Sequence, residues 1–234
     1  MKGKFFALFT NFLLCAILIF TATVGYDGAK IMRVSAEYKK VYYQAEKNRD
    51  GVCLTFNVYE RTDNVNKILD ILKRYGQTAT FFLGGAWADD NVDCVRKIYA
   101  EGHEIGSHGY FHKSHDKMSY KENLHEIEPS VRLLNAILLT EIKLFAPPSG
   151  AYNDATLLAC DELNLDVIMW SRDTIDWRDK DVNLIFKRAT KNLEGGEIIL
   201  MHPTDATIIA LDQILKFLSD NGLKTYTVSQ CIGE

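Results

Sequence analysis

The sequence contains little proline, no long run of basic residues and no low-complexity segment, and each absence excludes a class of protein. With 4 prolines and 15 glycines among 234 residues, the composition excludes collagen-like chains and long disordered stretches. The formal net charge is −4, from 27 basic and 31 acidic side chains. Because a nucleic-acid-binding face needs clustered Lys and Arg to neutralise phosphates, we expect no nucleic acid partner.

One long apolar run stands at the start of the chain. Lys2 and Lys4 precede an almost unbroken apolar stretch from Phe5 to Val24. A basic start followed by about 20 apolar residues is typical of an export signal or of a helix that spans a bilayer. The sequence leaves both open, so residues 1–25 are assigned to a signal peptide or an N-terminal membrane anchor. In either case we expect an exported protein, extracellular or in the cell envelope, that meets the membrane only through this segment.

Four cysteines lie beyond this segment, far apart and without a CxxC pair. An oxidising compartment permits disulfides, but sequence spacing alone does not pair cysteines. Cys53 lies in an apolar strand pattern, and Cys94 and Cys160 lie in helical patterns. We therefore expect these three and Cys231 to be buried free thiols.

From about residue 50 onward, short apolar runs alternate with amphipathic stretches whose apolar residues, such as Val65, Ile68 and Leu72, recur with a helical period. Repeated βα units predict parallel strands covered by helices, in an open doubly wound sheet or in a barrel. No GxGxxG follows the first strand, which disfavours a dinucleotide-binding sheet. The expected strands are Val52–Phe56, Thr78–Leu83, His103–Gly106, Leu144–Ala146, Asp166–Trp170, Glu197–Met201 and Lys224–Val228.

Helices are expected between most of these strands. Ser119 and Glu122 form a capping-box pattern at the start of the longest one, while Pro129 inside it predicts a kink or a break. The stretch before residue 51 is more polar, so residues 26–50 are assigned to a lead-in segment and 51–234 to one domain. The expected helices are Asn64–Tyr75, Asn91–Ala100, Ser119–Leu139, Asn153–Leu163, Asp181–Leu193 and Thr207–Leu218.

Side chains that could carry chemistry follow three of the expected strands. His108 and His112 follow the third strand and His202 follows the sixth, while the fifth is followed by Asp173, Asp176 and Trp177. An HxxxH pair alone is weak evidence for a metal site, and a single histidine or tryptophan is more often structural. In barrels of βα units, however, the reactive residues gather at the C-terminal ends of the strands. The combination therefore predicts one active site at these ends.

Five motifs, taken in order, resemble those of the polysaccharide deacetylase family, which is carbohydrate esterase family 4 and shares the NodB homology domain. The resemblance runs from about Val52 to Val228. It implies an α/β fold, a distorted (β/α)7 barrel, and a monomer that hydrolyses N-acetyl groups of an amino-sugar polymer such as peptidoglycan or chitin. The motif wording most resembles a sporulation-associated subgroup of exported homologues. The motifs are TFNV (Thr55–Val58), HGYFH (His108–His112), FAPPSG (Phe145–Gly150), DTIDW (Asp173–Trp177) and ILMHP (Ile199–Pro203).

The resemblance also implies roles for individual residues. The family's chemistry uses a divalent metal, zinc or else cobalt or nickel, that one aspartate and two histidines hold. Carried over by motif, His108 and His112 are the two imidazole ligands. His202 is the general acid that protonates the leaving amine, and Asp173 is the carboxylate that orients it. The substrate-binding residues implied are Trp177, Leu200, Pro147, Pro148 and Tyr110.

The first and third motifs depart from the family pattern. The family has two adjacent aspartates after Thr-Phe, where this chain has Asn57 at the base position and Val58 at the metal position. Asparagine does not accept a proton at useful pH, and valine does not ligate a metal. The family's arginine, which pairs with the base, is replaced by Ala146. Because an arginine without its aspartate would be an unpaired charge, the two losses fit together physically.

Two hypotheses follow. An active deacetylase would need a substitute carboxylate from a loop, for which Glu60, Asp63 and Asp154 are candidates. Where related homologues carry an acid, two residues after the asparagine, this chain has Tyr59. Alternatively, the chain is a catalytically inactive family member that keeps the groove and binds N-acetylated cell-wall glycan. Since two histidines without a third protein ligand hold a metal weakly, we expect metal binding to be weak or absent.

Overall fold

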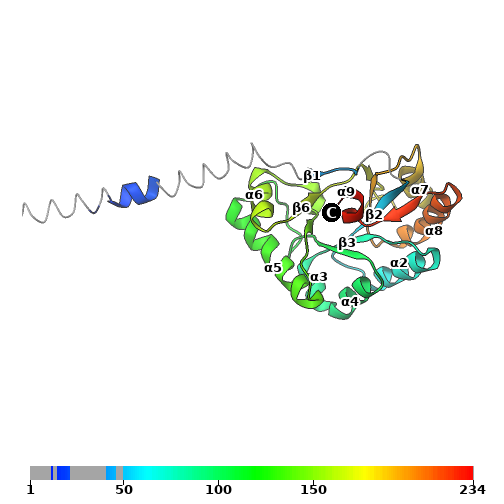
Figure 1. Ribbon diagram of the computed structural model, residues 1–234, viewed down its shortest axis with the longest axis horizontal. Helices are drawn as coiled ribbons and strands as arrows, with labels where there is room; N and C mark the ends of the chain where they lie inside the picture. Colours follow the sequence, from blue (N-terminus) through cyan, green and yellow to red (C-terminus); the bar gives the residue numbers. More distant parts are fainter. Residues whose placement is uncertain (1–11, 13–14, 22–40, 46–49, 234) are drawn as a thin grey trace, which may run out of the picture. The chain divides into compact units, whose positions relative to one another are not determined.

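The protein is described by a computed structural model that covers residues 12, 15–21, 41–45 and 50–233 (Figure 1). The chain divides into two compact units, Met1–Lys39 and Lys40–Glu234. In the first unit, residues 15–21 are helical. Within the described residues, the helices are all too short or too polar to cross a membrane. Most of the expected signal peptide or anchor lies outside the described residues and stays a prediction.

The second unit is organised around a curled sheet of parallel strands in the order β1-β6-β5-β4-β3-β2-β8-β7, with β9 also paired to β2. Every expected strand overlaps one of these, and β1 and β7 are additional. A curled parallel sheet covered by helices confirms the predicted α/β barrel class. The strands are β1 (Val41–Tyr42), β2 (Gly51–Val58), β3 (Thr80–Leu83), β4 (Glu104–Ser107), β5 (Leu144–Phe145), β6 (Asp166–Ile168), β7 (Arg172–Asp173), β8 (Ile198–Met201) and β9 (Lys224–Tyr226).

Residues 41–45 connect two strands that are not neighbours in the sheet. β1 pairs with β6, and the Ala45 N–H then donates to the Gly196 carbonyl, just before β8, at 2.7 Å. These residues belong to the second compact unit, Lys40–Glu234. The sequence did not reveal β1 because a strand of two residues carries too little periodicity to be recognised.

The helices surround the strands, as Figure 1 shows for α2 to α8, and α9 lies near the middle of the view. The capping box at Ser119 is present, but the long helix α5 continues through Pro129 without the expected break. The helices are α2 (Thr62–Tyr75), α3 (Gly85–Asp90), α4 (Val92–Ala100), α5 (Tyr120–Leu138), α6 (Asp154–Glu162), α7 (Val182–Thr190), α8 (Asp205–Asp220) and α9 (Val228–Ile232), with a 3-10 turn at Pro148–Gly150.

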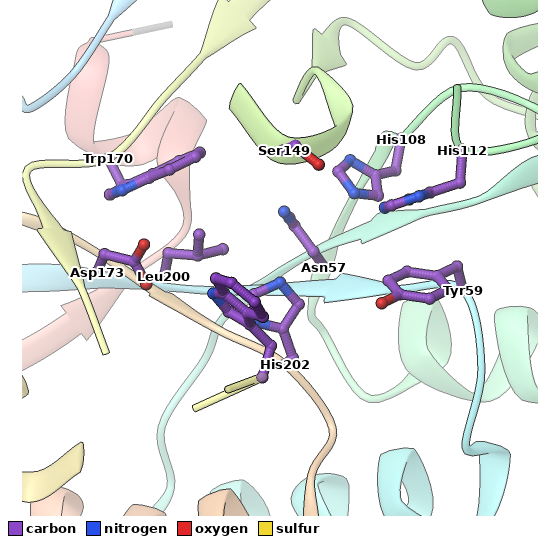
Figure 2. A pocket seen from close by; sticks show the side chains of 10 residues that line it. Asn57, Tyr59, His108, His112, Ser149, Trp170, Asp173, Leu200 and His202 are labelled. Carbon is purple, nitrogen blue, oxygen red and sulfur yellow. The ribbon is translucent and has the colours of Figure 1, made fainter. Parts of the chain in front are cut away.

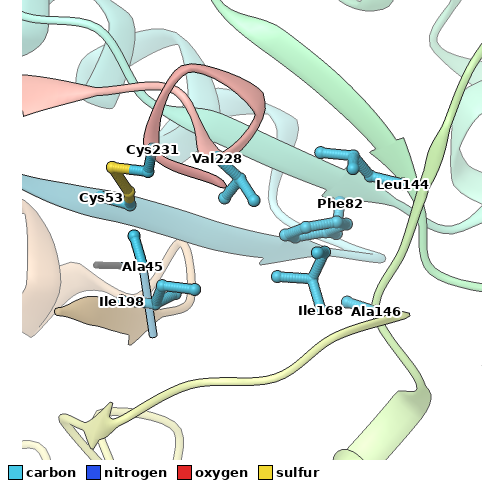
Figure 3. Close-up of a cluster of buried hydrophobic side chains, with 9 residues drawn as sticks. All are labelled: Ala45, Cys53, Phe82, Leu144, Ala146, Ile168, Ile198, Val228 and Cys231. Carbon is cyan, nitrogen blue, oxygen red and sulfur yellow. A yellow bond between two sulfur atoms is a disulfide. The ribbon is translucent and has the colours of Figure 1, made fainter. Parts of the chain in front are cut away.

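The interior of the barrel is filled by apolar side chains from five strands and α9 (Figure 3). Phe82 and Ile168 are each about 1% exposed, and burying a side chain of this size contributes roughly 1.5–3 kcal/mol. Alternate residues of a strand point to the same face, so Cys53 in this cluster places Asn57, four residues on, toward the interior as well. The cluster consists of Ala45, Cys53, Phe82, Leu144, Ala146, Ile168, Ile198, Val228 and Cys231.

The cysteine prediction was wrong for one pair. Cys53 at the start of β2 and Cys231 in α9 form a disulfide across 178 positions of sequence, with their Cα atoms 6.9 Å apart (Figure 3). β9 places α9 against the N-terminal end of β2, and no local pattern announces that contact. Cys94 and Cys160 are buried free thiols, as expected.

Candidate active site

A pocket of about 250 Å³ lies at the C-terminal ends of the strands, opposite α9. Figure 2 shows His108 and His112 on one side, Trp170 with Asp173 on the other, and His202 between the two groups. Strands β2, β4, β7 and β8 supply or precede most of its side chains, which is why residues far apart in sequence meet here. The lining residues are Asn57, Tyr59, His108, His112, Ser149, Trp170, Asp173, Trp177, Leu200 and His202.

Asn57 and Val58 end the buried strand β2, at the positions of the family's base and metal aspartates. Asn57 is only 3% exposed, and its Oδ1 atom is buried without a hydrogen-bond partner. Leaving a buried polar group unpaired costs about 1–3 kcal/mol. Val58 is fully buried and has an apolar side chain. Its backbone carbonyl accepts a hydrogen bond from the Gly84 N–H at 2.8 Å. This end of the site therefore carries no charge.

His108 and His112 come from the loop that follows β4. The His108 Nδ1 atom lies 2.7 Å from the Ala146 carbonyl, which only accepts, so Nδ1 carries the hydrogen and Nε2 keeps its lone pair. Burial lowers the pKa of His108 to about 3, and the neighbouring His112 adds to the effect. His112 has φ = 55°, and the two ring centroids are 5.0 Å apart. The loop thus presents two neutral imidazoles to the pocket.

Tyr59 covers part of this histidine pair. Its ring lies 4.1 Å from the His112 ring, centroid to centroid, at 35° between planes, and the residue is 42% exposed. Burial and the nearby Glu60 and Asp176 carboxylates raise the pKa of the Tyr59 hydroxyl, so the phenol stays neutral. The side chain of Tyr59 therefore adds an exposed aromatic surface beside the imidazoles.

The carboxylate that holds His202 is Asp176, which corrects the assignment of Asp173. The His202 Nδ1 atom lies 2.8 Å from Asp176 Oδ1, and the His202 backbone N–H donates to Asp176 Oδ2 at 2.6 Å. Asp173 instead accepts the Ile175 N–H at 2.8 Å. The turn after β7, where Ile175 has φ = 53°, brings Asp176 rather than Asp173 under the imidazole. Both carboxylates belong to the same motif, so the sequence alone did not distinguish them.

Replacing Asp176 by asparagine is expected to destabilise the fold, whereas replacing Asp173 is not. Asp176 is fully buried and also accepts the Thr207 hydroxyl at 2.5 Å. Asp176→Asn places an NH₂ group against N–H or O–H donors of His202 or Thr207. We expect the free energy of unfolding to fall by about 1–3 kcal/mol. The matched change Asp173→Asn should stay within about 0.5 kcal/mol, as is usual for solvent-accessible sites. Urea unfolding compares the two, and equal losses would contradict the assignment.

The substrate-binding predictions divide into two groups. Trp177 and Leu200 line the pocket, as expected. Pro147 and Pro148 are buried and do not line it, because the turn that follows presents Ser149 instead. Tyr110 is also not a lining residue. It packs against Gly85 at the start of α3, and its hydroxyl lies 3.5 Å from Asp89. The positive φ of Gly109, 73°, turns the loop so that Tyr110 leaves the pocket.

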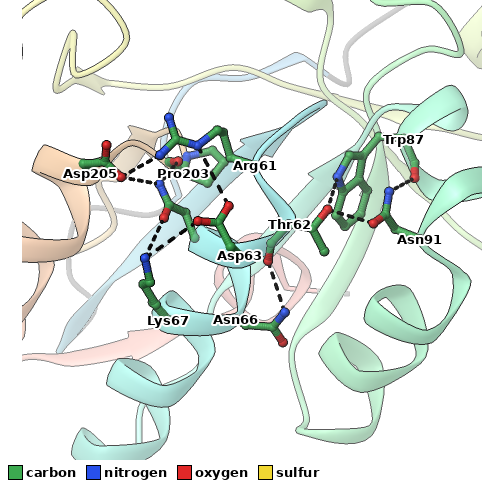
Figure 4. Close-up of polar contacts among 10 residues, drawn as sticks. Arg61, Thr62, Asp63, Asn66, Lys67, Trp87, Asn91, Pro203 and Asp205 are labelled. Atoms are coloured by element: carbon green, nitrogen blue, oxygen red, sulfur yellow. Dashed lines mark hydrogen bonds and ion pairs between the residues drawn. The ribbon is translucent and has the colours of Figure 1, made fainter.

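The loop between β2 and α2 is held against the loop between β8 and α8 (Figure 4). Arg61 pairs with Asp205 at 2.6 Å, and the buried Asn64 amide donates to the Pro203 carbonyl and to Asp205 at 3.0 and 2.9 Å. Arg61 has φ = 64°, a left-handed conformation whose energetic cost these contacts offset. The backbone that carries Tyr59 is therefore anchored beside His202.

The structure does not place Glu60, Asp63 or Asp154 where it could replace the missing metal-binding aspartate. The Asp63 carboxylate is exposed and faces Lys67 and Arg61 at 3.7 and 3.9 Å. Glu60 lines a smaller cavity, of about 90 Å³, beside His202 rather than beside the histidine pair. Asp154 begins α6 and is not a lining residue of the pocket. None of the three carboxylates is placed beside both His108 and His112.

The described residues do not fit a metal held by three protein side chains. His108 and His112 line the pocket and supply two imidazoles, whereas Val58, at the motif position of the third ligand, is apolar, fully buried and not a lining residue. Across the described part of the chain, no group of three His, Cys, Asp or Glu side chains could hold a metal ion. Catalytic zinc sites use three protein ligands and an open position. The described residues therefore lack the third protein ligand that such a zinc site needs.

Comparison with known proteins matches residues 44–168 to the model of the polysaccharide deacetylase family. The chain belongs to this family. Protein YlxY of Bacillus subtilis is 31% identical over 192 residues, which are 82% of this chain and 60% of YlxY. A peptidoglycan-N-acetylglucosamine deacetylase of Bacillus cereus is 32% identical over 186 residues, covering 77% of this chain and 68% of that enzyme. The chain also spans only 39% of the length of the related Bacillus subtilis deacetylase PdaC.

Solved structures of this deacetylase family include both active and inactive members. A family 4 pseudoenzyme from Bacillus anthracis has a TM-score of 0.79 at 32% identity, covering 83% of this chain and 69% of the pseudoenzyme. A mutant of that pseudoenzyme with restored enzymatic activity has the same TM-score at 30% identity, covering 83% of this chain and 71% of the mutant. A peptidoglycan N-acetylglucosamine deacetylase scores 0.80 at 30% identity, covering 84% and 94%.

Sequence reasoning did not assign Tyr59, Ser149 or Trp170 to the deacetylase-like site, and it gave Asp173 the contact with His202 that Asp176 makes. Asp176 lies within a motif already singled out, so proximity to His202 was the missing information. Trp170 is the last residue of an expected strand. In barrels of βα units, residues at this end of a strand usually face the active site. Ser149 lies in a turn with φ = 57°, which the sequence around it does not announce.

Proposed function

We propose that this family member binds N-acetylated cell-wall glycan in the pocket and that its hydrolysis of acetyl groups is severely impaired. The observation that carries the proposal is the end of β2, where an unpaired amide and a buried valine stand in place of base and metal ligand. Without a general base and a metal-bound water, amide hydrolysis loses its nucleophile. A pocket of about 250 Å³ nevertheless lies at this end of the strands, lined by imidazoles and aromatic rings.

The neutral base side supports this proposal. Ala146 replaces the guanidinium that would pair with a base, and it lies in the apolar interior cluster. An arginine there without Asp at position 57 would be a buried unpaired charge, which is strongly unfavourable. The structural similarity to a pseudoenzyme of the same family, and to its mutant with restored activity, is consistent with a site that has lost catalysis while keeping its fold.

The remaining lining supports a glycan ligand. Trp177 and Tyr59 are 55% and 42% exposed at the pocket, and exposed aromatic rings present flat apolar surfaces with a polar tip. Relatives named for peptidoglycan deacetylation suggest peptidoglycan as the polymer. We further propose that the protein is a monomer and that residues 1–25 export it or anchor it in the membrane. We also propose a role in sporulation and only weak binding of zinc, cobalt or nickel.

A residual N-deacetylase is the second candidate function. His202 and the buried Asp176 carboxylate form the kind of pair that could protonate a leaving amine. This half of the chemistry is present, whereas the half that generates the nucleophile is not. The two candidates therefore differ in metal content and acetate release rather than in glycan binding.

The test measures metal, acetate and binding on the same preparation of full-length protein. We expect zinc well below one equivalent, no acetate release from chitotetraose, and saturable binding of that oligomer by calorimetry. Cellotetraose, which has the same linkage but no acetamido groups, is the ligand control and should bind more weakly. Zinc-dependent acetate release that disappears in His112→Ala would establish the residual deacetylase instead. Absence of binding to chitotetraose would exclude the glycan-binding function.

A further inference from the structure

The side-chain amide of Asn57 is buried at the pocket without a protein partner. The hydrogen bonds of the described residues include none to either its oxygen or its nitrogen, and Oδ1 is fully enclosed. Figure 2 shows the amide projecting from β2 into the space between His108 and Trp170. Because buried polar side chains are normally hydrogen-bonded, the NH₂ group that projects into this space calls for an acceptor that enters through the pocket.

The chemistry of an amide specifies that partner. A side-chain amide offers an acceptor oxygen and a donor NH₂ group. Since Oδ1 is enclosed by protein, only the NH₂ group can meet a ligand, and the acetamido group of an N-acetyl sugar presents a carbonyl acceptor for it. A deacetylated sugar carries an amine in place of the acetamido group. When this amine is protonated, it has no lone pair and cannot accept a hydrogen bond from the NH₂ group. The Asn57 amide therefore discriminates between the two.

The surroundings of Asn57 favour the same ligand group. His108 donates its Nδ1 hydrogen to the Ala146 carbonyl, so its Nε2 atom faces outward only as an acceptor. A carbonyl ligand finds no donor there, and the Asn57 NH₂ group supplies one. Leu200 and Trp177 line the same pocket and provide apolar surface for a methyl group. Together these groups match the polar and apolar parts of an acetamide.

We propose that Asn57 is a specificity-determining residue that recognises the intact acetamido group, so the pocket selects N-acetylated over deacetylated glycan units. The substitution that removes the base thus adds a recognition element at the same position. The inference rests on the proposed glycan-binding function and deepens it, because it names the chemical group that is read.

The experiment compares the binding of chitotetraose and of its fully deacetylated counterpart by calorimetry on the full-length protein. We expect the wild-type protein to prefer the acetylated oligomer by about tenfold, the value of a typical buried hydrogen bond. Asn57→Leu, similar in volume but without polar atoms, should weaken acetylated binding and abolish the preference. In Asn57→Asp the buried carboxyl stays protonated in the free protein, and the ammonium of the deacetylated oligomer supplies the cation that allows it to ionise, so the preference should shift toward that oligomer.

Asn221→Asp is the matched control, since it makes the same substitution at the exposed end of α8, and it should leave both affinities unchanged. Thermal melting checks that each variant is folded, and Asn57→Leu carries the test if Asn57→Asp does not fold. A wild-type preference that survives in a folded Asn57→Leu protein would overturn the inference while leaving the glycan-binding function intact. Failure of the wild-type protein to bind either oligomer would overturn both.

Discussion

The triple variant Asn57→Asp, Val58→Asp and Ala146→Arg is expected to bind zinc stoichiometrically and to release acetate from chitotetraose. Val58→Asp adds a third protein ligand to the two imidazoles, which completes the donor count of a catalytic zinc site. Asn57→Asp supplies the general base. Since the rest of the pocket and the His202–Asp176 pair are already in place, the gain should be from no detectable activity to a measurable rate.

The arginine belongs in the variant because of where Ala146 lies. Ala146 is 3% exposed in the barrel interior, on the side toward which Asn57 also points. An aspartate at position 57 without a cation would be a buried charge, and its pKa would rise until it stayed protonated. Paired with the new arginine, it stays ionised and can accept a proton. We expect Ala146→Arg alone to lower stability by about 3–5 kcal/mol, the effect of an unpaired buried charge.

The control for the triple variant replaces Val58 by asparagine instead of aspartate. This protein has the same base and arginine and nearly the same side-chain volume, but a neutral amide is a poor zinc ligand. Metal analysis and acetate release should therefore separate the two proteins completely. A folded triple variant without bound zinc would show that the β2–α2 loop, with Tyr59 against His112, occupies the space that the metal needs.

Removing the disulfide between Cys53 and Cys231 is expected to lower the free energy of unfolding by about 2–5 kcal/mol. The bond joins residues 178 positions apart, so it restricts a large part of the unfolded chain. It also ties α9 to the barrel interior, where Val228 and Cys231 are fully buried. For a domain of this size the melting temperature should fall by roughly 5–15 °C in the double variant Cys53→Ala and Cys231→Ala.

Reduction provides the matching control for this prediction. A reducing agent should lower the melting temperature of the wild-type protein by a similar amount and leave the double variant unchanged. Cys94→Ala, which removes a buried free thiol, should keep the sensitivity to reduction. A wild-type protein whose melting temperature does not respond to reduction would show that the bond does not contribute to stability.

Several features of the site followed from the sequence because they depend on local pattern. Apolar runs indicated the strands, and helical periodicity indicated the helices between them. In a barrel of βα units the active site lies at the C-terminal ends of the strands. His108, His112 and His202 were therefore expected to meet, and the pocket contains all three. The absence of a carboxylate at Asn57 and Val58 was equally visible, because side-chain identity needs no structure.

Other features depended on loop conformation and were misjudged. Asp173 and Asp176 are three residues apart in one motif, and only the turn at Ile175 decides which carboxylate reaches His202. The sequence offers Asp63 as a metal ligand, but its carboxylate pairs with Lys67 on the surface. Positive φ values at non-glycine residues follow from tertiary contacts, and sequence propensity rarely predicts them.

The amino-acid sequence by itself determined the βα alternation, the family and the loss of the usual base and metal ligand, because each of these depends on residue identity and spacing. Only the tertiary structure decided which residues touch. It joined residues 41–45 to the sheet, paired Cys53 with Cys231, and left the Asn57 amide without a partner. These are contacts between distant segments, and the sheet register and loop dihedral angles that create them are set by the packing of the whole barrel.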